Sequence, residues 1–507
     1  MLLIFPPIAK ACEPPPGIAR LAAFLKVHGQ SCRLLDANLE GQLWLLKQPL
    51  AATDTWSRRA FKGRDRNVSA LRDITAYQTP DRYRSAISDL NHVLRIHSSH
   101  SGATIGLADY QHATLSPLRS ADLCAEALNP EGNPFFPYFS QRLPELLAGV
   151  GIAGFSLNYL SQALCTFAMI GYVRKRYPAI RIVLGGGLVT SWMRRAGWRN
   201  PFGNLVDHLF AGAGEEQLLA LRGIKPAPYR YAAPDYADLP LKEYFSPGLI
   251  LPYSASEGCY WSRCSFCPER AEGNAFHPVP VSRVLSELKF LTDQTGPVLI
   301  HLLDSSISPA LLQALCKNPP GAPWYGFARF DEHLADPEFC HALKRSGCVM
   351  LKLGLESGDQ GVLDRMCKGI DLAVASRVLN NLREAGIAVY CYLLFGTPGE
   401  TAVEAGRTLE FVVRHHHAIS FLNLALFNMP LHGDEAPVFG DKPFYEGDLS
   451  LYTSFRHPGE WNRKQARHFL EGTFKRHPVI AAIVRNDPPQ FSSSHAALFC
   501  GIQKISP

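Results

Sequence analysis

Three cysteines on one short stretch are the residues best suited to do chemistry. Cys259, Cys264 and Cys267 lie within nine residues, with four residues between the first two and two between the last pair. Thiolates spaced so closely on one loop can converge on a single metal centre. If that centre is a four-iron cluster, three protein ligands leave one iron open to a substrate or cofactor.

Three interpretations of this stretch compete. A structural zinc site usually takes four ligands from two Cys-x-x-Cys-like pairs, and only the pair Cys264–Cys267 is present. A thioredoxin-type redox pair begins a helix and needs no third cysteine. A cluster with an open iron uses all three thiols, so we favour it. The other ten cysteines are isolated from one another, which indicates reduced thiols rather than a disulfide framework.

The cysteines follow an apolar run at 249–253, so their loop leaves the carboxyl end of a predicted strand. Strands and amphipathic helices alternate from there on, which predicts six β/α units and an open barrel of the TIM type rather than a closed eight-stranded one. The expected strands are 249–255, 297–303, 323–329, 348–355, 387–395 and 420–428, and the expected helices lie near 281–293, 309–317, 336–346, 372–385 and 401–414.

Polar or turn-forming residues follow these strands. Chemistry in such a sheet belongs at the carboxyl ends of the strands, where the cysteine loop also lies. Each of these residues alone is also compatible with helix capping, a pattern that Ser308 and Thr397 fit well. Their joint placement beside the cysteines favours a site. The candidates are Asp304, Ser305, Arg329, Glu356, Gly396 and Pro398.

The first part of the chain predicts a second sheet. Residues 2–5, 18–28 and 32–35 read as strand, helix and strand, and the alternation resumes at about 150, which indicates a doubly wound parallel sheet. The polar, Arg-rich stretch 40–140 interrupts it as a mostly helical insertion, for which a structural cap or lid is favoured over catalysis. Glycines after strands form tight turns or let a ligand approach the backbone. The candidates there are Ser156, Gly185, Gly186, Gly187, Gly212, Gly214 and Glu215.

The composition excludes several other classes. The chain has 507 residues and a net charge of +6 without a long basic block, so nucleic-acid binding is not indicated. Its longest apolar runs are far below the roughly 18 residues that a membrane helix needs. The first residues lack a basic region before the apolar run, so we expect no signal peptide and a cytoplasmic location.

With these motifs in view, the chain resembles a cobalamin-binding radical S-adenosylmethionine (SAM) enzyme of the class B methyltransferase type. Phe266 stands between the last two cysteines as in the family, whereas the family has three rather than four residues between the first two. The resemblance implies an α/β chain with a Rossmann-like cobalamin domain at 1–225, a linker at 226–248, a partial (β/α)6 radical SAM barrel at 249–435 and a small α-rich extension at 436–507.

The resemblance also implies the roles of the candidate residues. The three cysteines would bind a [4Fe-4S] cluster, and SAM would bind its open iron. Asp304 and Ser305, Arg329, Glu356 and the turn Gly396–Pro398 would contact SAM, and the candidates between Ser156 and Glu215 would contact cobalamin. Cobalamin would lack a histidine ligand from the protein, because the chain has no Asp-x-His-x-x-Gly motif.

The implied activity is methylation of an unactivated carbon through a 5′-deoxyadenosyl radical and methylcobalamin. A rearrangement, oxidation or cyclisation by the same cofactors is the alternative, and a non-catalytic cobalamin or iron–sulfur sensor is a third. A methylthiotransferase would need a second cysteine triad, but Cys12, Cys32, Cys124 and Cys165 are scattered. The expected partners are a small-molecule or peptide substrate and an electron donor such as flavodoxin or ferredoxin.

Overall fold

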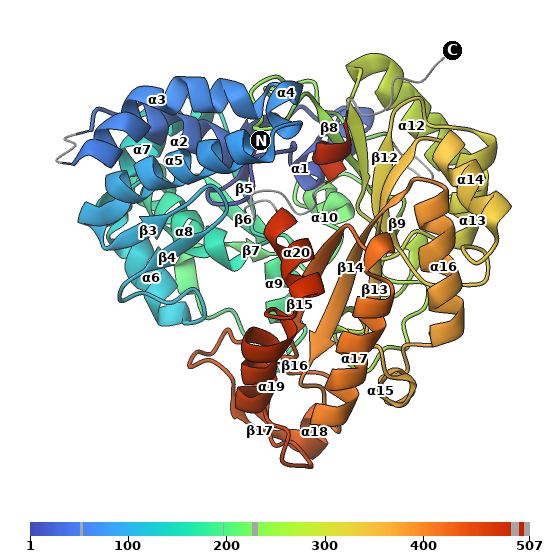
Figure 1. Ribbon diagram of the computed structural model, residues 1–507. Helices are drawn as coiled ribbons and strands as arrows, with labels where there is room; N and C mark the ends of the chain where they lie inside the picture. The colour runs from blue at the N-terminus through green and yellow to red at the C-terminus, as the bar shows by residue number, and fades with distance from the viewer. Residues whose placement is uncertain (51–53, 196, 226–231, 488–495, 501–507) are drawn as a thin grey trace. The chain divides into compact units, whose positions relative to one another are not determined.

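The computed structural model describes residues 1–50, 54–195, 197–225, 232–487 and 496–500. The chain divides into two compact units (Figure 1). Unit 1 comprises Met1–Ile250 and Glu446–Ser450, and unit 2 comprises Leu251–Tyr445 and the described residues from Leu451 onward. No helix in these described ranges has both the length and the apolar character that a membrane crossing demands.

Unit 1 is built on a five-stranded parallel sheet. Its order is β2 (Arg33–Asp36), β1 (Leu2–Phe5), β5 (Ile152–Ser156), β6 (Arg181–Gly185) and β7 (His208–Leu209). The chain reverses direction across the sheet between β1 and β5, and ligands of doubly wound sheets bind at such a switch point. The helices that follow strands are α1 (Pro16–Val27), α8 (Leu160–Arg176), α9 (Gly187–Met193) and α10 (Glu215–Ala220).

The segment between β2 and β5 is mostly helical and includes one hairpin. Asp36 begins its first helix by accepting a hydrogen bond of 2.9 Å from the backbone N–H of Leu39, as an N-cap residue does. The helices are α2 (Ala37–Lys47), α3 (Thr55–Leu71), α4 (Ile74–Tyr77), α5 (Pro80–Ser98), α6 (Ser120–Leu128) and α7 (Phe136–Leu147), and β3 (Ala103–Ile105) pairs with β4 (Tyr110–His112).

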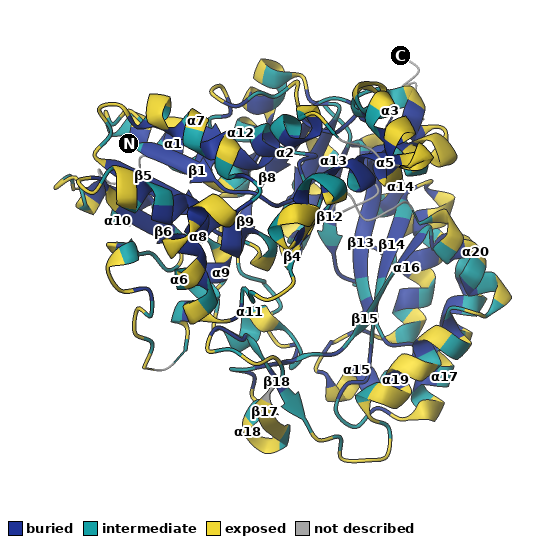
Figure 2. Ribbon diagram, turned by 90° about the vertical axis from the view of Figure 1, so that its left-hand side faces the viewer, coloured by how far each residue is buried: buried dark blue, intermediate teal, exposed yellow. Residues whose placement is uncertain are grey.

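Unit 2 contains six parallel strands whose order in the sheet is their order in the chain, as an open (β/α)6 array requires. They are β8 (Ile250–Tyr253), β11 (Leu299–Leu302), β12 (Trp324–Ala328), β13 (Cys348–Glu356), β14 (Ala388–Phe395) and β15 (Phe421–Leu426). The helices between them are α12 (Val281–Thr295), α13 (Pro309–Lys317), α14 (Pro337–Arg345), α15 (Gln360–Arg365), α16 (Leu372–Glu384) and α17 (Ala402–Arg414). Buried strands and partly exposed helices give this unit its core (Figure 2).

Two predicted helix caps have different outcomes. The Ser308 hydroxyl accepts from the backbone N–H of Leu311 at 3.3 Å and caps α13, as predicted. Thr397 does not cap a helix, because α17 begins five residues later. Its cap is Thr401, which forms a reciprocal capping box with Glu404. Thr397 is thereby left within the turn that follows β14.

The C-terminal part contains several helices, as expected, and also a small sheet that was not foreseen. A three-stranded antiparallel sheet runs in the order β16 (Met429–Pro430), β18 (Tyr452–Phe455) and β17 (Gly440–Pro443). Aromatic and β-branched residues in β18 favour a strand there. The helices of this part are α18 (Ala436–Phe439), α19 (Arg463–Phe469), one π-helical stretch (Leu470–Phe474) and α20 (Pro478–Asn486).

Candidate functional site

The cysteine loop has a fixed entry and a fixed exit. It runs from the short strand β9 (Ser256–Glu257) to the helix α11 (Pro268–Ala271), and β9 pairs with β10 (His277–Pro278). Gly258 has a φ of 71°, and a Cβ atom there would lie 2.4 Å from the carbonyl oxygen of Ala275. Only glycine therefore fits at the entry. Cys267 occupies the N-cap position of α11.

The three thiols lie in a partly buried setting. Cys264 is buried, whereas Cys259 and Cys267 are half-buried. Burial raises the pKa of the Cys264 thiol, and the positive charges of Lys368 and Arg329 oppose that rise. Burial also raises the pKa of Cys267, where backbone N–H groups at the start of α11 act in the opposite sense. All thirteen cysteines lie in the described part of the chain, and none of them forms a disulfide.

These thiols do not surround a position for one ion. In the described ranges, no three His, Cys, Asp or Glu side chains are grouped as ligands of a single metal ion. An iron–sulfur cluster needs no such common point, because each thiolate binds a different iron atom. The charge of Cys264 acts on Cys267, so these two thiols are near each other. The loop is therefore compatible with a cluster.

Arg329 connects the cysteine loop with the strand ends. It directly follows β12, is buried, and has its Nη1 atom 4.0 Å from the Sγ atom of Cys264. Its Nη2 atom donates to the carbonyl oxygen of Lys368. The guanidinium also lies over the ring of Trp261, with 4.2 Å between Cζ and the ring centroid. One predicted site residue thus lies beside one of the three predicted cysteine ligands, Cys264.

Glu356 forms a buried ion pair that sequence analysis did not foresee. Its carboxylate lies 2.8 Å from the Nζ atom of Lys368, and the two side chains are 12% and 9% exposed. Glu356 ends β13 with a φ of 66°, a strained conformation for a residue other than glycine. A Cβ atom at Gly354 would lie 2.3 Å from the Glu356 carboxylate, so this glycine makes room for the pair.

Lys368 also reaches the cysteine loop. Its ammonium group lies 5.3 Å from the ring centroid of Phe266, the residue between the last two cysteines. The sequence offers little reason to select Lys368, because this residue follows the short helix α15 and not a strand. Its identity as a site residue depends on the chain folding back, which spacing along the sequence does not reveal.

The four-residue link between Cys259 and Cys264 places Trp261. Ser262 has a φ of 44°, which turns the backbone, and the indole N–H of Trp261 donates to the carbonyl oxygen of Cys367 at 3.2 Å. The ring covers Gly369, where a Cβ atom would lie 2.0 Å from it. The longer link therefore presents an aromatic ring to Arg329.

Asp304 is occupied by the backbone that leads into the loop. Its carboxylate accepts from the backbone N–H of Ala255 at 3.1 Å and from the Ser256 hydroxyl. Burial raises its pKa, and these hydrogen bonds oppose the rise. This geometry makes Asp304 a residue that positions β9, while Ser305 beside it is exposed. The predicted contacts of both with SAM remain predictions.

The carboxylate of Glu400 stabilises the turn after β14, to which this residue belongs. Gly396 has a φ of 77°, and its backbone N–H donates to the Glu400 carboxylate, which also accepts from the Trp461 indole at 3.2 Å. Burial raises the pKa of Glu400 to about 7. Pro398 is half-buried in this turn. Among the described residues, the hydroxyl of Thr397 and Oε1 of Glu400 find no hydrogen-bond partner.

In unit 1, Ser156 and Gly187 meet at Asn158, a residue that was not predicted. The amide of Asn158 donates to the Ser156 hydroxyl at 3.0 Å and accepts from the backbone N–H of Gly187 at 2.9 Å. Gly186 has a φ of 110°, and a Cβ atom there would lie 2.4 Å from the carbonyl oxygen of Leu157. The structure thus gives Gly186 a packing role at the end of β6.

Of the remaining candidates in unit 1, some have open space around them and others contact neighbouring residues. Gly185 ends β6, and a Cβ atom there would touch Phe210 at 3.5 Å. Gly212 has a φ of 70° and open space around it, which suits a ligand beside the backbone. Gly214 precedes α10, and Glu215 is paired with Arg20 at 2.6 Å. This pairing occupies one carboxylate oxygen of Glu215, and its predicted contact with cobalamin remains a prediction.

Known proteins resemble this chain in sequence and in fold. The model of the radical SAM superfamily matches residues 253–412, so this part of unit 2 is a radical SAM domain. The bacteriochlorophyllide d C-12(1)-methyltransferase of Chlorobaculum tepidum is 27% identical over 231 residues, which are 44% of this chain and 46% of that enzyme. The chain thus spans about half the length of this relative.

Two solved structures share the fold over most of the chain. The cobalamin-dependent SAM radical enzyme OxsB, with aqua-cobalamin bound, has a TM-score of 0.57 at 12% identity, over 92% of this chain and 65% of that one. The radical SAM methyltransferase TsrM of Kitasatospora setae, with cobalamin and a [4Fe-4S] cluster bound, has a TM-score of 0.52 at 15% identity, over 91% and 84%. At such identities the likeness concerns the fold.

Proposed function

We propose that this protein is a cobalamin-dependent radical SAM enzyme that methylates an unactivated carbon. The observation that carries the proposal is the meeting of Cys264 with Arg329 and, through Lys368, with Glu356. A set of cysteines suited to a cluster thus lies against charged groups at the ends of β12 and β13. Fixed charges at a partly buried site are what orientation of a charged cosubstrate needs.

The residues present fit the absent groups. Cys259, Cys264 and Cys267 would hold a [4Fe-4S] cluster, since Arg329 and Lys368 favour the thiolate form of Cys264. Ser156, Asn158 and Gly212 line the carboxyl ends of the unit 1 strands, where cobalamin would bind. When bound, these groups supply an electron for cleavage of SAM and a methyl group for transfer.

The protein's own residues would bind and orient SAM. Arg329 offers a guanidinium for its carboxylate, and Glu356 offers a carboxylate for its amine. Lys368 holds Glu356 in place, and Trp261 holds Arg329. Arg329 and Lys368 are buried, which limits the access of water that would quench a reactive radical.

One observation supports a second candidate function. OxsB, a cobalamin-dependent SAM radical enzyme, has the higher TM-score of the two structural relatives above. The same residues in this chain would then support a rearrangement, oxidation or cyclisation. The products formed from SAM distinguish the two: methyl transfer yields S-adenosylhomocysteine together with 5′-deoxyadenosine, and the alternative yields 5′-deoxyadenosine alone.

The proposal is tested by reconstituting the chain without oxygen with iron, sulfide and cobalamin, followed by incubation with SAM and a reductant. Both nucleoside products are expected. S-adenosylhomocysteine without 5′-deoxyadenosine would contradict radical chemistry, even though a methyltransferase would remain. The electron donor in the cell is proposed to be a flavodoxin or ferredoxin, which purified donors in place of a chemical reductant would test.

A further inference from the structure

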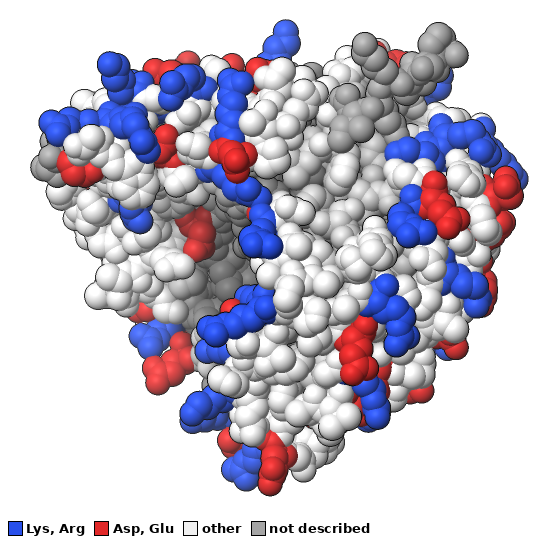
Figure 3. All heavy atoms as spheres, in the orientation of Figure 1, with Lys and Arg blue, Asp and Glu red and all other residues white. Residues whose placement is uncertain are grey.

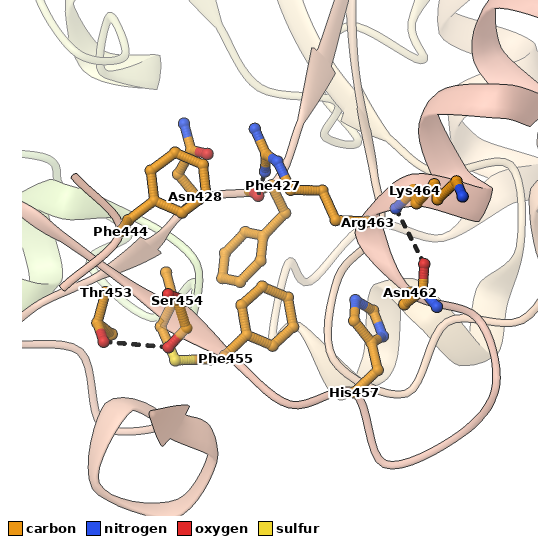
Figure 4. A pocket seen from close by; sticks show the side chains of 11 residues that line it. Phe427, Asn428, Phe444, Thr453, Ser454, Phe455, His457, Asn462, Arg463 and Lys464 are labelled. Carbon is orange, nitrogen blue, oxygen red and sulfur yellow. Dashed lines mark hydrogen bonds between the residues drawn. The ribbon is translucent and has the colours of Figure 1, made fainter. Parts of the chain in front are cut away.

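A small pocket in unit 2 lies beside the radical SAM site without sharing its residues. It has a volume of about 220 Å³ and lies where four segments meet: the end of β15, the turn after β17, β18 with the residues after it, and the start of α19 (Figure 4). None of the cysteines, Arg329, Glu356 or Lys368 lines it. The part of the chain after residue 436 therefore builds most of this pocket.

The walls of the pocket are aromatic. The rings of Phe427 and Phe455 are 5.3 Å apart at an interplanar angle of 75°, and the ring of His457 lies 4.7 Å from that of Phe455. Figure 4 shows these three rings around the same space. Edge-to-face and offset contacts of this kind favour another flat ring as occupant. The volume suits one ring system with a short substituent.

The charged residues of the pocket are all basic. Arg463 and Lys464 line it, and no Asp or Glu is among its lining residues. The guanidinium of Arg463 lies 4.7 Å from the ring centroid of Phe444 and donates to the carbonyl oxygen of Phe427, so its position is fixed. A fixed, partly desolvated cation selects an anion, and guanidinium matches a carboxylate.

Two hydrogen-bond acceptors in the pocket lack a donor. Oδ1 of Asn428 and Nε2 of His457 are buried and have no partner among the described residues. His457 makes a hydrogen bond with the backbone of Gly396, and since Nε2 has no partner, Nδ1 makes it. Burial lowers the pKa of His457, so the ring is neutral and Nε2 is an acceptor. An occupant with an N–H or O–H group would satisfy such an atom.

The pocket is connected to one strand-end turn of unit 2. His457, which lines the pocket, makes a hydrogen bond with the backbone of Gly396 in the turn after β14. The pocket therefore lies where a substrate could be held close to SAM while the SAM-orienting charges remain separate.

We propose that this pocket binds the aromatic ring of an anionic substrate that carries an N–H or O–H donor. The proposal rests on the function proposed above and adds the substrate class. Three probes separate its elements: 4-hydroxyphenylacetate has the ring, the donor and the anion, phenylacetate lacks the donor, and tyramine replaces the anion by a cation. Binding of each to the reconstituted chain is measured by equilibrium dialysis.

The expected order of affinity is 4-hydroxyphenylacetate, then phenylacetate about fivefold weaker, then tyramine at least about tenfold weaker. Phe455→Leu and Arg463→Gln should each weaken the first probe by about tenfold. Phe290→Leu, on the outer face of α12 where the side chain is 56% exposed, is the matched control and should change it less than about twofold.

Equal binding of the three probes, or no binding of any, would overturn the pocket assignment. The same holds if Phe455→Leu weakens SAM binding about tenfold, because the pocket would then hold part of SAM. Release of 5′-deoxyadenosine from SAM is recorded for the same samples. If it persists while the probes fail to bind, the substrate class is wrong and the radical SAM function stands; if it is absent with a full cluster, the proposed function itself fails.

Discussion

The indole ring of Trp261 lies against the guanidinium of Arg329, with 4.2 Å between Cζ of the arginine and the ring centroid. The indole N–H is fixed in turn by the carbonyl oxygen of Cys367. A cation over an aromatic face is stabilised by about 0.5 to 2 kcal/mol, depending on desolvation. The extra length of the link between the first two cysteines thus has a structural consequence: it carries a ring that holds a charged residue beside Cys264.

Replacing Trp261 should weaken SAM binding through Arg329. For Trp261→Ala we expect about tenfold weaker binding in equilibrium dialysis, because the guanidinium loses the surface that positions it. Trp261→Phe keeps a ring without the N–H and should lose about threefold or less. Iron and sulfide per chain should be the same in both variants. SAM bound by Trp261→Ala as tightly as by the native chain would refute this positioning role.

Gly354→Ala tests the buried ion pair. The added methyl group would lie 2.3 Å from the Glu356 carboxylate and 2.8 Å from the Lys368 ammonium, so both charged ends must shift and we expect their pairing to be disrupted. Disruption of a buried pair costs about 3 kcal/mol, which urea unfolding of the chain would record. Gly406→Ala in α17 is the control, because a Cβ atom there meets nothing within 4 Å. It should be neutral or stabilising by about 1 kcal/mol. Equal effects of the two variants would contradict the steric argument.

Glu400 should make stability depend on pH. Its pKa in the folded chain is about 7, above the ordinary 4.5, because burial disfavours the carboxylate. The folded state therefore binds a proton more tightly than the unfolded state. This stabilisation is complete below pH 4.5 and is lost as the pH rises through 7, to a total of about 3 kcal/mol.

Glu400→Gln removes the ionisation and should make the chain more stable than the native one at about pH 8 but not at about pH 5. Urea titrations at both pH values provide the measurement. Glu410→Gln, at an exposed position of the same region, should leave the pH dependence unchanged. A native pH profile retained in Glu400→Gln would show that another group is responsible.

If the three cysteines of the loop are the cluster ligands, replacing Cys264 and replacing Cys367 should affect iron binding differently. Cys264→Ala should lose most of the iron bound on reconstitution, because a ligand is removed. Cys367 is exposed, and its backbone carbonyl contacts the loop through Trp261. Cys367→Ala should retain the full cluster and SAM binding. If Cys367→Ala lost iron, a fourth cysteine would be implicated and the cluster would have no open iron; a full cluster in Cys264→Ala would refute the ligand set.

The strands of unit 2 could be predicted because each is an apolar run followed by polar or turn-forming residues. β13 and β14, for example, lie where the apolar runs 348–355 and 387–395 were read. Arg329 and Glu356 could be named for the same reason. Basic and acidic side chains are interspersed on the face drawn in Figure 3, so the surface adds no comparable signal.

The rest depended on contacts between residues distant in the chain. Lys368 and Trp261 become site residues only when the segment after α15 lies against the cysteine loop. The pocket residues Phe427 and Arg463 are 36 positions apart and come together through a sheet that was not foreseen. Periodicity finds elements, but it does not show which turns meet. Asp304 was selected by its position after a strand, whereas its carboxylate faces the backbone of Ala255.

The central claim is tested most directly by SAM cleavage in the fully reconstituted chain. The chain is loaded without oxygen, its iron, sulfide and cobalamin are quantified, and 5′-deoxyadenosine is measured after addition of SAM and a reductant. We expect 5′-deoxyadenosine from the native chain and none from Cys264→Ala under the same conditions. Absence of 5′-deoxyadenosine from a native chain that carries a complete four-iron cluster and binds SAM would contradict the radical mechanism.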